Sequence, residues 1–254
     1  LGRFLGGVGK MKVTAIIPAR YAATRLPGKV LKDICGKTMI QRVYEQVSKA
    51  NNLDQVIVAT DDKRVYQEVE SFGGRVEMTS KEHSTGTDRL AEVAKDLDSE
   101  IIVNVQGDEP LLNPAMIDQA VQPLLDDIEI KMSTLKHKIE DEEELEDHNA
   151  VKVVTDKDDF ALYFSRSLIP YPRSEAEMTC YKHIGLYVYR RDFLLDYTNL
   201  EPTPLEKKES LEQLRALENG YQIKVVETEH QVIGVDTEED LRKVRKAVKS
   251  SKKK

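Results

Sequence analysis

The stretch that decides the fold is Ile16-Ile17-Pro18-Ala19-Arg20-Tyr21-Ala22-Ala23-Thr24-Arg25-Leu26-Pro27-Gly28-Lys29. The apolar run 13–17 predicts a buried strand, and the strand ends abruptly in a loop that contains prolines, a glycine and cations. In an open parallel sheet, such a loop lies at the carboxyl edge of the strands, where ligands bind. Arg20, Arg25 and Lys29 then offer positive charge to a polyanion such as a triphosphate. Taken alone, the loop fits a solvated basic surface better, because most charge runs are only that.

Strands and helices alternate on the carboxyl-terminal side of this stretch. Apolar runs at 55–60, 75–78 and 101–105 predict strands, and helical spacing at 38–50, 63–72 and 88–97 predicts helices. This alternation implies right-handed β-α-β crossovers. We therefore predict an α/β fold with a doubly wound, mostly parallel sheet.

The pattern changes after residue 130. Strand-like runs at 131–137, 151–155, 161–164 and 183–189 follow one another with few helix patterns, which predicts an antiparallel subdomain. Helices are expected at 204–219 and after Thr237, with a strand at 223–226 between them. The expected division is an appended or mis-started segment at 1–10, a nucleotide-binding part at 11–130, the antiparallel subdomain at 131–190, a return to the α/β part at 191–246 and a frayed tail at 247–254.

Composition excludes several classes of protein. A net charge of −7 over 254 residues argues against a dedicated nucleic-acid surface. The only cysteines, Cys35 and Cys180, form neither a zinc motif nor a disulfide framework, so a reducing cytoplasm is expected. No run is long and apolar enough to span a membrane, and no signal peptide is recognised. The glycine patterns of P-loop kinases and dinucleotide-binding dehydrogenases are incomplete.

Two aspartates follow predicted strands, and both are expected at the same edge of the sheet. Asp108 follows the apolar run 101–105, and Asp236 lies in a turn before the last helix. Magnesium takes oxygen ligands, often one or two carboxylates completed by substrate phosphates and water. The pair therefore predicts a magnesium site beside the basic loop. Each aspartate by itself fits a helix cap or turn residue more simply.

Two further polar clusters indicate substrate contacts. The loop 83–89 leads into a helix, and its hydroxyls and backbone amides suit a ribose, a base edge or a phosphate. Arg166 and Arg173 suit a carboxylate, while His183 and Tyr187 lie on one face of a predicted strand and suit sugar hydroxyls. A sugar acid is a natural acceptor for this set. The alternative is that the histidine and tyrosine are ordinary core residues.

Several long motifs, in this order along the chain, resemble the 3-deoxy-manno-octulosonate (Kdo) cytidylyltransferase family. They are Ile-Ile-Pro-Ala-Arg-Tyr at 16–21, Arg-Leu-Pro-Gly-Lys at 25–29, Ala-Thr-Asp-Asp at 59–62, Val-Asn-Val-Gln-Gly-Asp-Glu-Pro at 103–110, Ala-Leu-Tyr-Phe-Ser-Arg at 161–166, Leu-Glu-Gln-Leu-Arg at 211–215 and Gly-Val-Asp-Thr at 234–237. The resemblance covers residues 11–244. One departure is Ala23, where the family usually has a serine.

The resemblance implies a Rossmann-like nucleotidyltransferase that activates Kdo with CTP in lipopolysaccharide synthesis. Members are magnesium-dependent cytoplasmic homodimers. Carried over by motif, Arg20, Arg25 and Lys29 bind the triphosphate, Arg20 and Lys29 also act in catalysis, Thr85, Gly86, Thr87 and Gln106 help to hold the nucleotide, Asp108 and Asp236 are catalytic magnesium ligands, and Arg166, Arg173, His183, Tyr187, Glu212 and Gln213 face the sugar acid. Two alternatives stay open: a cytidylyltransferase for 8-amino-Kdo or a sialic acid, and a regulator that binds sugar nucleotides without catalysis.

Overall fold

The computed structural model describes residues 10–22, 26–173 and 179–251. The strands of this part of the chain are β1 Val13–Pro18, β2 Gln55–Thr60, β3 Val76–Met78, β4 Ile101–Asn104, β5 Met132–Lys138, β6 Lys152–Thr155, β7 Ala161–Ser165, β8 Tyr181–Arg190 and β9 Lys224–Glu227. The helices are η1 Lys29–Leu31, a short 3₁₀ turn, and α1 Met39–Val47, α2 Lys63–Ser71, α3 Gly86–Ala94, α4 Pro114–Asp126, α5 Glu142–Glu146, α6 Arg191–Tyr197, α7 Pro204–Glu209, α8 Leu214–Glu218 and α9 Glu238–Ser251.

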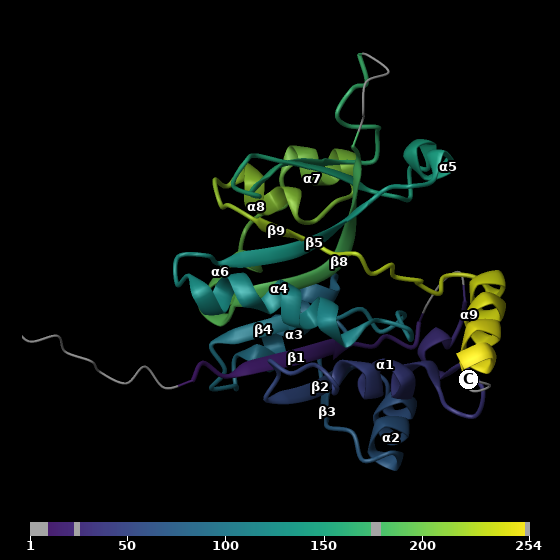
Figure 1. The fold of residues 1–254 in the computed structure, drawn as a ribbon. Coiled ribbons are helices and arrows are strands. Elements are labelled where there is room, and N and C mark those ends of the chain that lie inside the picture. The colour runs from purple at the N-terminus through teal and green to yellow at the C-terminus, as the bar shows by residue number, and fades with distance from the viewer. Residues whose placement is uncertain (1–9, 23–25, 174–178, 252–254) are drawn as a thin grey trace, which may run out of the picture.

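All the described strands belong to one sheet, whose main path runs β3-β2-β1-β4-β8-β5-β9. The first four strands of that path are parallel, and β9 is parallel to β5. Strand β8 is antiparallel to both β4 and β5, and β6 and β7 extend the antiparallel part. Figure 1 shows β5, β8 and β9 above the parallel strands, with α9 on the side where β1 ends. The prediction of a doubly wound, mostly parallel α/β sheet is confirmed.

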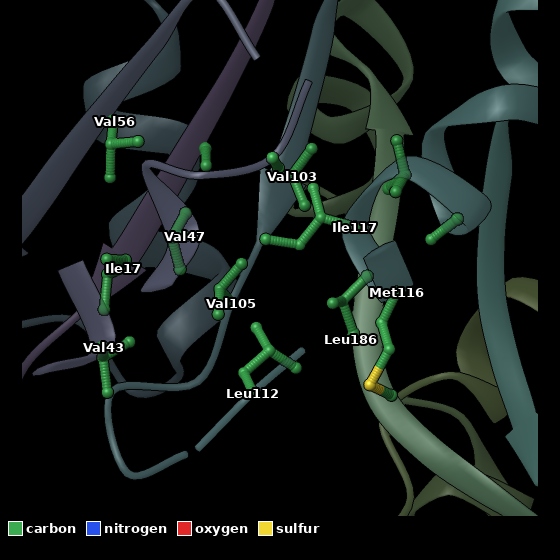
Figure 2. Close-up of a cluster of buried hydrophobic side chains, with 14 of the residues drawn as sticks. Ile17, Val43, Val47, Val56, Val103, Val105, Leu112, Met116, Ile117 and Leu186 are labelled. Atoms are coloured by element: carbon green, nitrogen blue, oxygen red, sulfur yellow. The ribbon is translucent and has the colours of Figure 1, made fainter. Parts of the chain in front are cut away.

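Helices cover both faces of the sheet because its central strands are apolar on both faces. In β1, Ala15 and Ile17 pack in one core with α1 and α4, whereas Ile16 packs in a second core with α3 and α6. Figure 2 shows the first core, in which Ile17 of β1 lies near Val43 of α1. A third, smaller cluster joins Leu241 of α9 to the residues around η1. Because successive residues of β1 point into different cores, helices pack on both faces of the sheet and produce a three-layer fold.

One predicted helix is wrong. The sequence predicts a single helix over 204–219, but the structure contains α7 and α8, separated by a break at Ser210. Ser210 has a φ of 52°, in the left-handed region, and the α-helical hydrogen-bond pattern cannot continue through it. The leucine spacing survives the break, since Leu211 and Leu214 are both buried.

Other boundaries differ from the sequence expectations. Helices α4 and α6 are additional to the predicted ones, and the predicted antiparallel strands continue the parallel sheet. Helix α9 extends to Ser251, so the frayed tail expected from 247 onward is helical as far as that residue. No described helix is long and apolar enough to cross a membrane.

Candidate active site

Three residues predicted from separate motifs meet at the carboxyl edge of the parallel strands. Lys29 Nζ donates to Asp108 Oδ2 at 2.6 Å and to Asp236 Oδ1 at 3.0 Å. Asp108 lies 79 positions and Asp236 207 positions from Lys29 along the chain. The Lys29 side chain is only 14% exposed. The tertiary structure thus brings together the basic loop and both predicted magnesium ligands.

Two glycines allow this approach. Gly28 has a φ of +65°, in the left-handed region that glycine adopts without strain, and directly precedes Lys29 in η1. Gly107 lies so close to the end of β1 that a Cβ atom there would stand 2.9 Å from the carbonyl oxygen of Pro18. The loop before Asp108 therefore packs directly against the loop that carries Arg20.

The electrostatics of this cluster favour a charged Lys29. Burial lowers the pKa of Lys29, but the charges and hydrogen bonds of Asp108 and Asp236 outweigh that effect and hold the pKa above its usual value. The neighbouring Glu109 behaves differently, because burial and the adjacent Asp108 charge raise its pKa to about 8. The site therefore combines an ion-paired ammonium with a carboxylic acid that is largely protonated at neutral pH.

A cavity of about 260 Å³ opens beside Lys29 and collects most of the predicted nucleotide-binding residues. Its lining includes Arg20, Lys29, Gly86, Gln106 and Asp108. Arg20 Nη2 donates to the carbonyl oxygen of His83 at 3.0 Å, which holds the guanidinium against the loop 83–89. This arrangement places cations, backbone amides near the start of α3 and a carboxylate around one small space.

The two threonines of loop 83–89 have different roles. Thr85 caps α3: its Oγ1 accepts from the Asp88 amide at 3.1 Å, and Asp88 Oδ2 accepts from the Thr85 amide at 3.0 Å. Thr87 is buried, and its side chain hydrogen-bonds to Glu212 and Tyr189. The Thr85 hydroxyl is therefore already used for local structure, and Thr87 connects the loop to the predicted sugar-acid residues.

His183 and Tyr187 lie together on β8, as their spacing predicts. Their ring centroids are 5.3 Å apart, and the His183 ring also meets Phe164 edge-on at 5.0 Å. His183 Nε2 lies 3.0 Å from Thr134 Oγ1. Burial lowers the pKa of His183 to about 3 and raises that of Tyr187 well above its usual value, so both rings are neutral at pH 7. Such groups suit sugar hydroxyls better than a charged phosphate.

The nucleotide and sugar-acid residues are joined through Gln106. Gln106 Nε2 donates to the carbonyl oxygen of Gly185, midway between His183 and Tyr187, at 3.4 Å. A larger cavity of about 740 Å³ lies at this junction, and Glu109, His183 and Gly185 contribute to its lining. The two predicted halves of the site are therefore adjacent.

Glu212 and Gln213 lie in the segment between α7 and α8. Burial raises the pKa of Glu212, and its hydrogen bond to Thr87 and the charge of Arg215 partly offset that effect. Gln213 is 5% exposed, and its Nε2 has no hydrogen-bond partner among the described residues. A buried amide donor without a partner is costly, so Gln213 is well suited to receive a polar ligand atom.

The structure does not place the arginines predicted to bind the sugar acid beside His183. The Arg166 guanidinium donates to the carbonyl oxygens of Glu209 at 2.7 Å, His148 at 3.0 Å and Ser210 at 3.3 Å. In this structure it therefore stabilises the backbone at the break between α7 and α8. Arg173 is exposed, and no contact brings it to His183 within the part of the chain that the structure describes. Arg25 and Ala23 lie outside the described residues.

The donor set around Lys29 fits magnesium of the substrate-completed kind. No group of three or more histidine, cysteine, aspartate or glutamate side chains is placed to hold a metal within the described ranges. The two carboxylates of Asp108 and Asp236 do converge on one cationic atom, the Lys29 nitrogen. Two carboxylates with phosphate oxygens and water form a usual magnesium environment.

Sequence reasoning missed two residues of this region. Thr134 of β5 is the hydroxyl partner of His183, and its own position in the strand carries no signal of that pairing. Glu109 follows Asp108 directly, and its Oε2 is buried without a described partner. Only the Gln-Gly-Asp-Glu-Pro context at 106–110 could have drawn attention to Glu109.

A parallel sheet edge with clustered cations, a carboxylate pair and an adjoining polar cavity is typical of a nucleotide-binding α/β protein of the transferase type. A cytidylyltransferase family model matches residues 14–226. The chain is 59% identical over 245 residues to the 3-deoxy-manno-octulosonate cytidylyltransferase of Geobacter metallireducens, covering 92% of this chain and 96% of the relative. With the Geotalea uraniireducens protein of the same name, identity is 58% over 250 residues, 94% of this chain and 100% of the relative. The chain belongs to the 3-deoxy-manno-octulosonate cytidylyltransferases.

Solved structures agree with this placement. A CMP:2-keto-3-deoxy-manno-octonic acid synthetase complexed with CTP superposes with a TM-score of 0.91 at 44% identity, over 94% of this chain and 99% of the other. A cytidylyltransferase from Leptospira borgpetersenii shares the fold at a TM-score of 0.63 and 19% identity, over 94% of this chain and 87% of the other.

Proposed function

We propose that this protein transfers the cytidylyl group of CTP to 3-deoxy-manno-octulosonate (Kdo), forming CMP-Kdo and pyrophosphate for lipopolysaccharide synthesis. The observation that carries the proposal is the convergence of Lys29, Asp108 and Asp236 beside the cavity lined by Arg20 and Gln106. This convergence occurs in a chain 59% identical to a 3-deoxy-manno-octulosonate cytidylyltransferase.

The chemistry is a direct displacement. The anomeric hydroxyl of Kdo attacks the α-phosphorus of CTP, and the new oxygen–phosphorus bond forms as the bond to pyrophosphate breaks. Arg20 and Lys29 stabilise the negative charge that collects on the departing pyrophosphate. Asp108 and Asp236 are the residues that would hold magnesium, which neutralises phosphate charge and lowers the pKa of a coordinated hydroxyl.

The acceptor is oriented by the pocket on β8 and the α7–α8 segment. Neutral His183 and Tyr187 present donors and acceptors to sugar hydroxyls, and Gln213 has a buried amide donor available. Glu212, held by Thr87, lies in the same segment. Arg166 would bind the sugar carboxylate only if it exchanged some of its carbonyl contacts for that ligand.

The test is pyrophosphate release with CTP, magnesium and each candidate acceptor in turn: Kdo, 8-amino-Kdo and a sialic acid. We expect Kdo to give the highest kcat/KM and UTP or ATP to give much less product. Preference for another acceptor would replace Kdo in the proposal. Binding of CTP and Kdo without pyrophosphate release would favour a regulator instead.

We further propose that the protein acts in the cytoplasm as a homodimer. The free cysteines Cys35 and Cys180 support a reducing compartment. Leu162 of β7 is 61% exposed and Tyr171 is 84% exposed, which supports an apolar contact made by the antiparallel part of the chain. Light scattering of the wild type and of Leu162→Asp tests the dimer, and a monomeric wild type would contradict it.

A further inference from the structure

Lys29 contacts both of the carboxylates that the proposed function assigns to a metal. Its ammonium contacts both Asp108 and Asp236, and its side chain is 14% exposed while theirs are 30% and 49% exposed. The two carboxylate oxygens therefore lie no further apart than the sum of their distances to Lys29 Nζ. Carboxylates this close repel each other unless a cation lies between them.

We propose that the Lys29 ammonium is the resident counter-cation of the two-aspartate site, and that magnesium displaces it, which releases Lys29 to bind the substrate phosphates. The proposal rests on the proposed function and deepens it, because it assigns one residue to two successive positions. It also explains why a residue expected at the triphosphate is found between the carboxylates.

The charges make the exchange favourable only when both new partners are present. One ammonium neutralises half of the charge of two carboxylates, whereas one divalent cation neutralises all of it. Displacement alone would leave a partly buried ammonium without its partners, at a desolvation cost. A triphosphate removes that cost because it offers new negative oxygens to the released ammonium. Metal and nucleotide should therefore promote each other's binding through Lys29.

The surrounding structure allows Lys29 to move while Arg20 stays in place. The backbone of Lys29 is held in η1, where its amide donates to the Leu26 carbonyl oxygen at 3.0 Å. Its flexible four-carbon stem can redirect the ammonium from the carboxylates into the adjoining 260 Å³ cavity, which Lys29 already lines. Arg20 lines the same cavity but is bound to the His83 carbonyl. Arg20 is thus the fixed phosphate cation and Lys29 the exchangeable one.

The proposal makes an unusual prediction about magnesium binding. If Lys29 competes with the metal, its removal must tighten magnesium binding when no nucleotide is present. We expect Lys29→Met to bind Mg²⁺ about tenfold more tightly than the wild type by titration calorimetry without CTP or sugar, the factor that corresponds to about 1.4 kcal/mol. When a non-hydrolysable CTP analogue is present, the same variant should bind Mg²⁺ more weakly than the wild type.

Two control variants separate competition from a general loss of charge. Lys29→Arg keeps a cation at the site and should bind Mg²⁺ as the wild type does. Lys32→Met removes an exposed lysine nearby, whose Nζ lies 3.4 Å from Glu238 Oε1, and should also leave Mg²⁺ binding unchanged. Lys29→Gln, which retains a hydrogen-bond donor, replaces Lys29→Met if that variant does not fold, and the same tightening is expected.

A thermal readout does not depend on catalysis. Without metal, Lys29→Met should melt below the wild type because its carboxylates face each other uncompensated, and added Mg²⁺ should raise its melting temperature more than that of the wild type. Equal or weaker Mg²⁺ binding by the variant, including undetectable binding by both proteins, would overturn the proposal. Failure of the proposed function would appear separately, as wild-type protein that releases no pyrophosphate from CTP and Kdo.

Discussion

Asp236 is one of the two carboxylates that we propose as magnesium ligands. It joins the last part of the chain to Lys29 in the first, at 3.0 Å. We expect Asp236→Asn to keep the fold and to lower turnover on the order of 10²- to 10³-fold, because an amide neither binds a cation as a carboxylate does nor carries its charge. Pyrophosphate release measures the effect, and circular dichroism verifies the fold.

Glu238→Gln is the matched control for Asp236. It removes a carboxylate two positions away that contacts Lys32 and not Lys29. This variant should retain wild-type turnover. Near-normal turnover of Asp236→Asn would contradict the placement of the aspartate at the reacting phosphates.

His183 gives the fold a dependence on pH. Its pKa is about 3 in the folded protein because of burial, whereas the ordinary value of about 6.5 applies after unfolding. The unfolded chain therefore binds more protons between these values, and the free energy of unfolding falls as the pH drops through that window. Between pH 7 and pH 5, the free energy of unfolding of the wild type should fall by up to about 2 kcal/mol more than that of His183→Gln.

Urea unfolding followed by circular dichroism at several pH values measures this difference. His148→Gln is the control, because it removes an exposed histidine in place of the buried one. Parallel stability curves for the wild type and His183→Gln would show that the ring is accessible to protons in the folded state.

At the scale of elements, the contact between the loops after β1 and β4 determines the distance from Arg20 to Asp108. Gly107 makes this contact possible, since a Cβ there would lie 2.9 Å from the Pro18 carbonyl oxygen. We expect Gly107→Ala to cost roughly 1–3 kcal/mol of stability, as overpacking does. It should also raise the KM for CTP, because the two loops must separate.

Denaturant unfolding and steady-state kinetics check both effects. Gly234→Ala provides the comparison, because a Cβ at Gly234 meets nothing within 4 Å. That variant should remain within about 0.5 kcal/mol of the wild type. Equal behaviour of the two alanine variants would mean that the loops adjust without cost.

At the scale of the whole molecule, α9 packs against the segment that carries Lys29 and the start of α1 (Figure 1). Leu241 and Val244 are fully buried there against Ile34 and Met39. We expect Leu241→Ala to cost about 2–5 kcal/mol, because it removes a buried side chain and leaves a cavity. Hydrogen exchange should then show lower protection around η1 and the start of α1, far along the chain from the substitution.

Arg242→Ala, which changes the exposed face of α9, should leave that protection unchanged. If loss of protection after Leu241→Ala stayed within α9, the helix would not stabilise the Lys29 loop. Its packing would then contribute to overall stability alone.

The residue pattern predicts an element correctly where all the interactions that form the element lie within it. The apolar run before Pro18 predicts β1, and the helix predicted after Thr237 is α9. Thr237 Oγ1 accepts from the Asp240 amide at 3.2 Å, so the interaction at the start of this helix is local. The break at Ser210 was not predictable in this way. Serine occurs within helices, so Ser210 by itself does not signal a break. Its left-handed φ is accompanied by a hydrogen bond from the Arg166 guanidinium to its carbonyl oxygen, and Arg166 is distant in sequence.

The amino-acid sequence by itself determined the α/β class and the family, and it predicted most residues of the candidate site, though not Thr134 or Glu109. These predictions follow from periodicity and from motifs that are contiguous along the chain. Only the tertiary structure decided which partners those residues take. It paired Lys29 with Asp108 and Asp236, Thr87 with Glu212, and Arg166 with backbone carbonyls. The physical reason is that each pairing depends on the burial and approach of segments from different elements, and no local pattern encodes the distance between two side chains 207 positions apart.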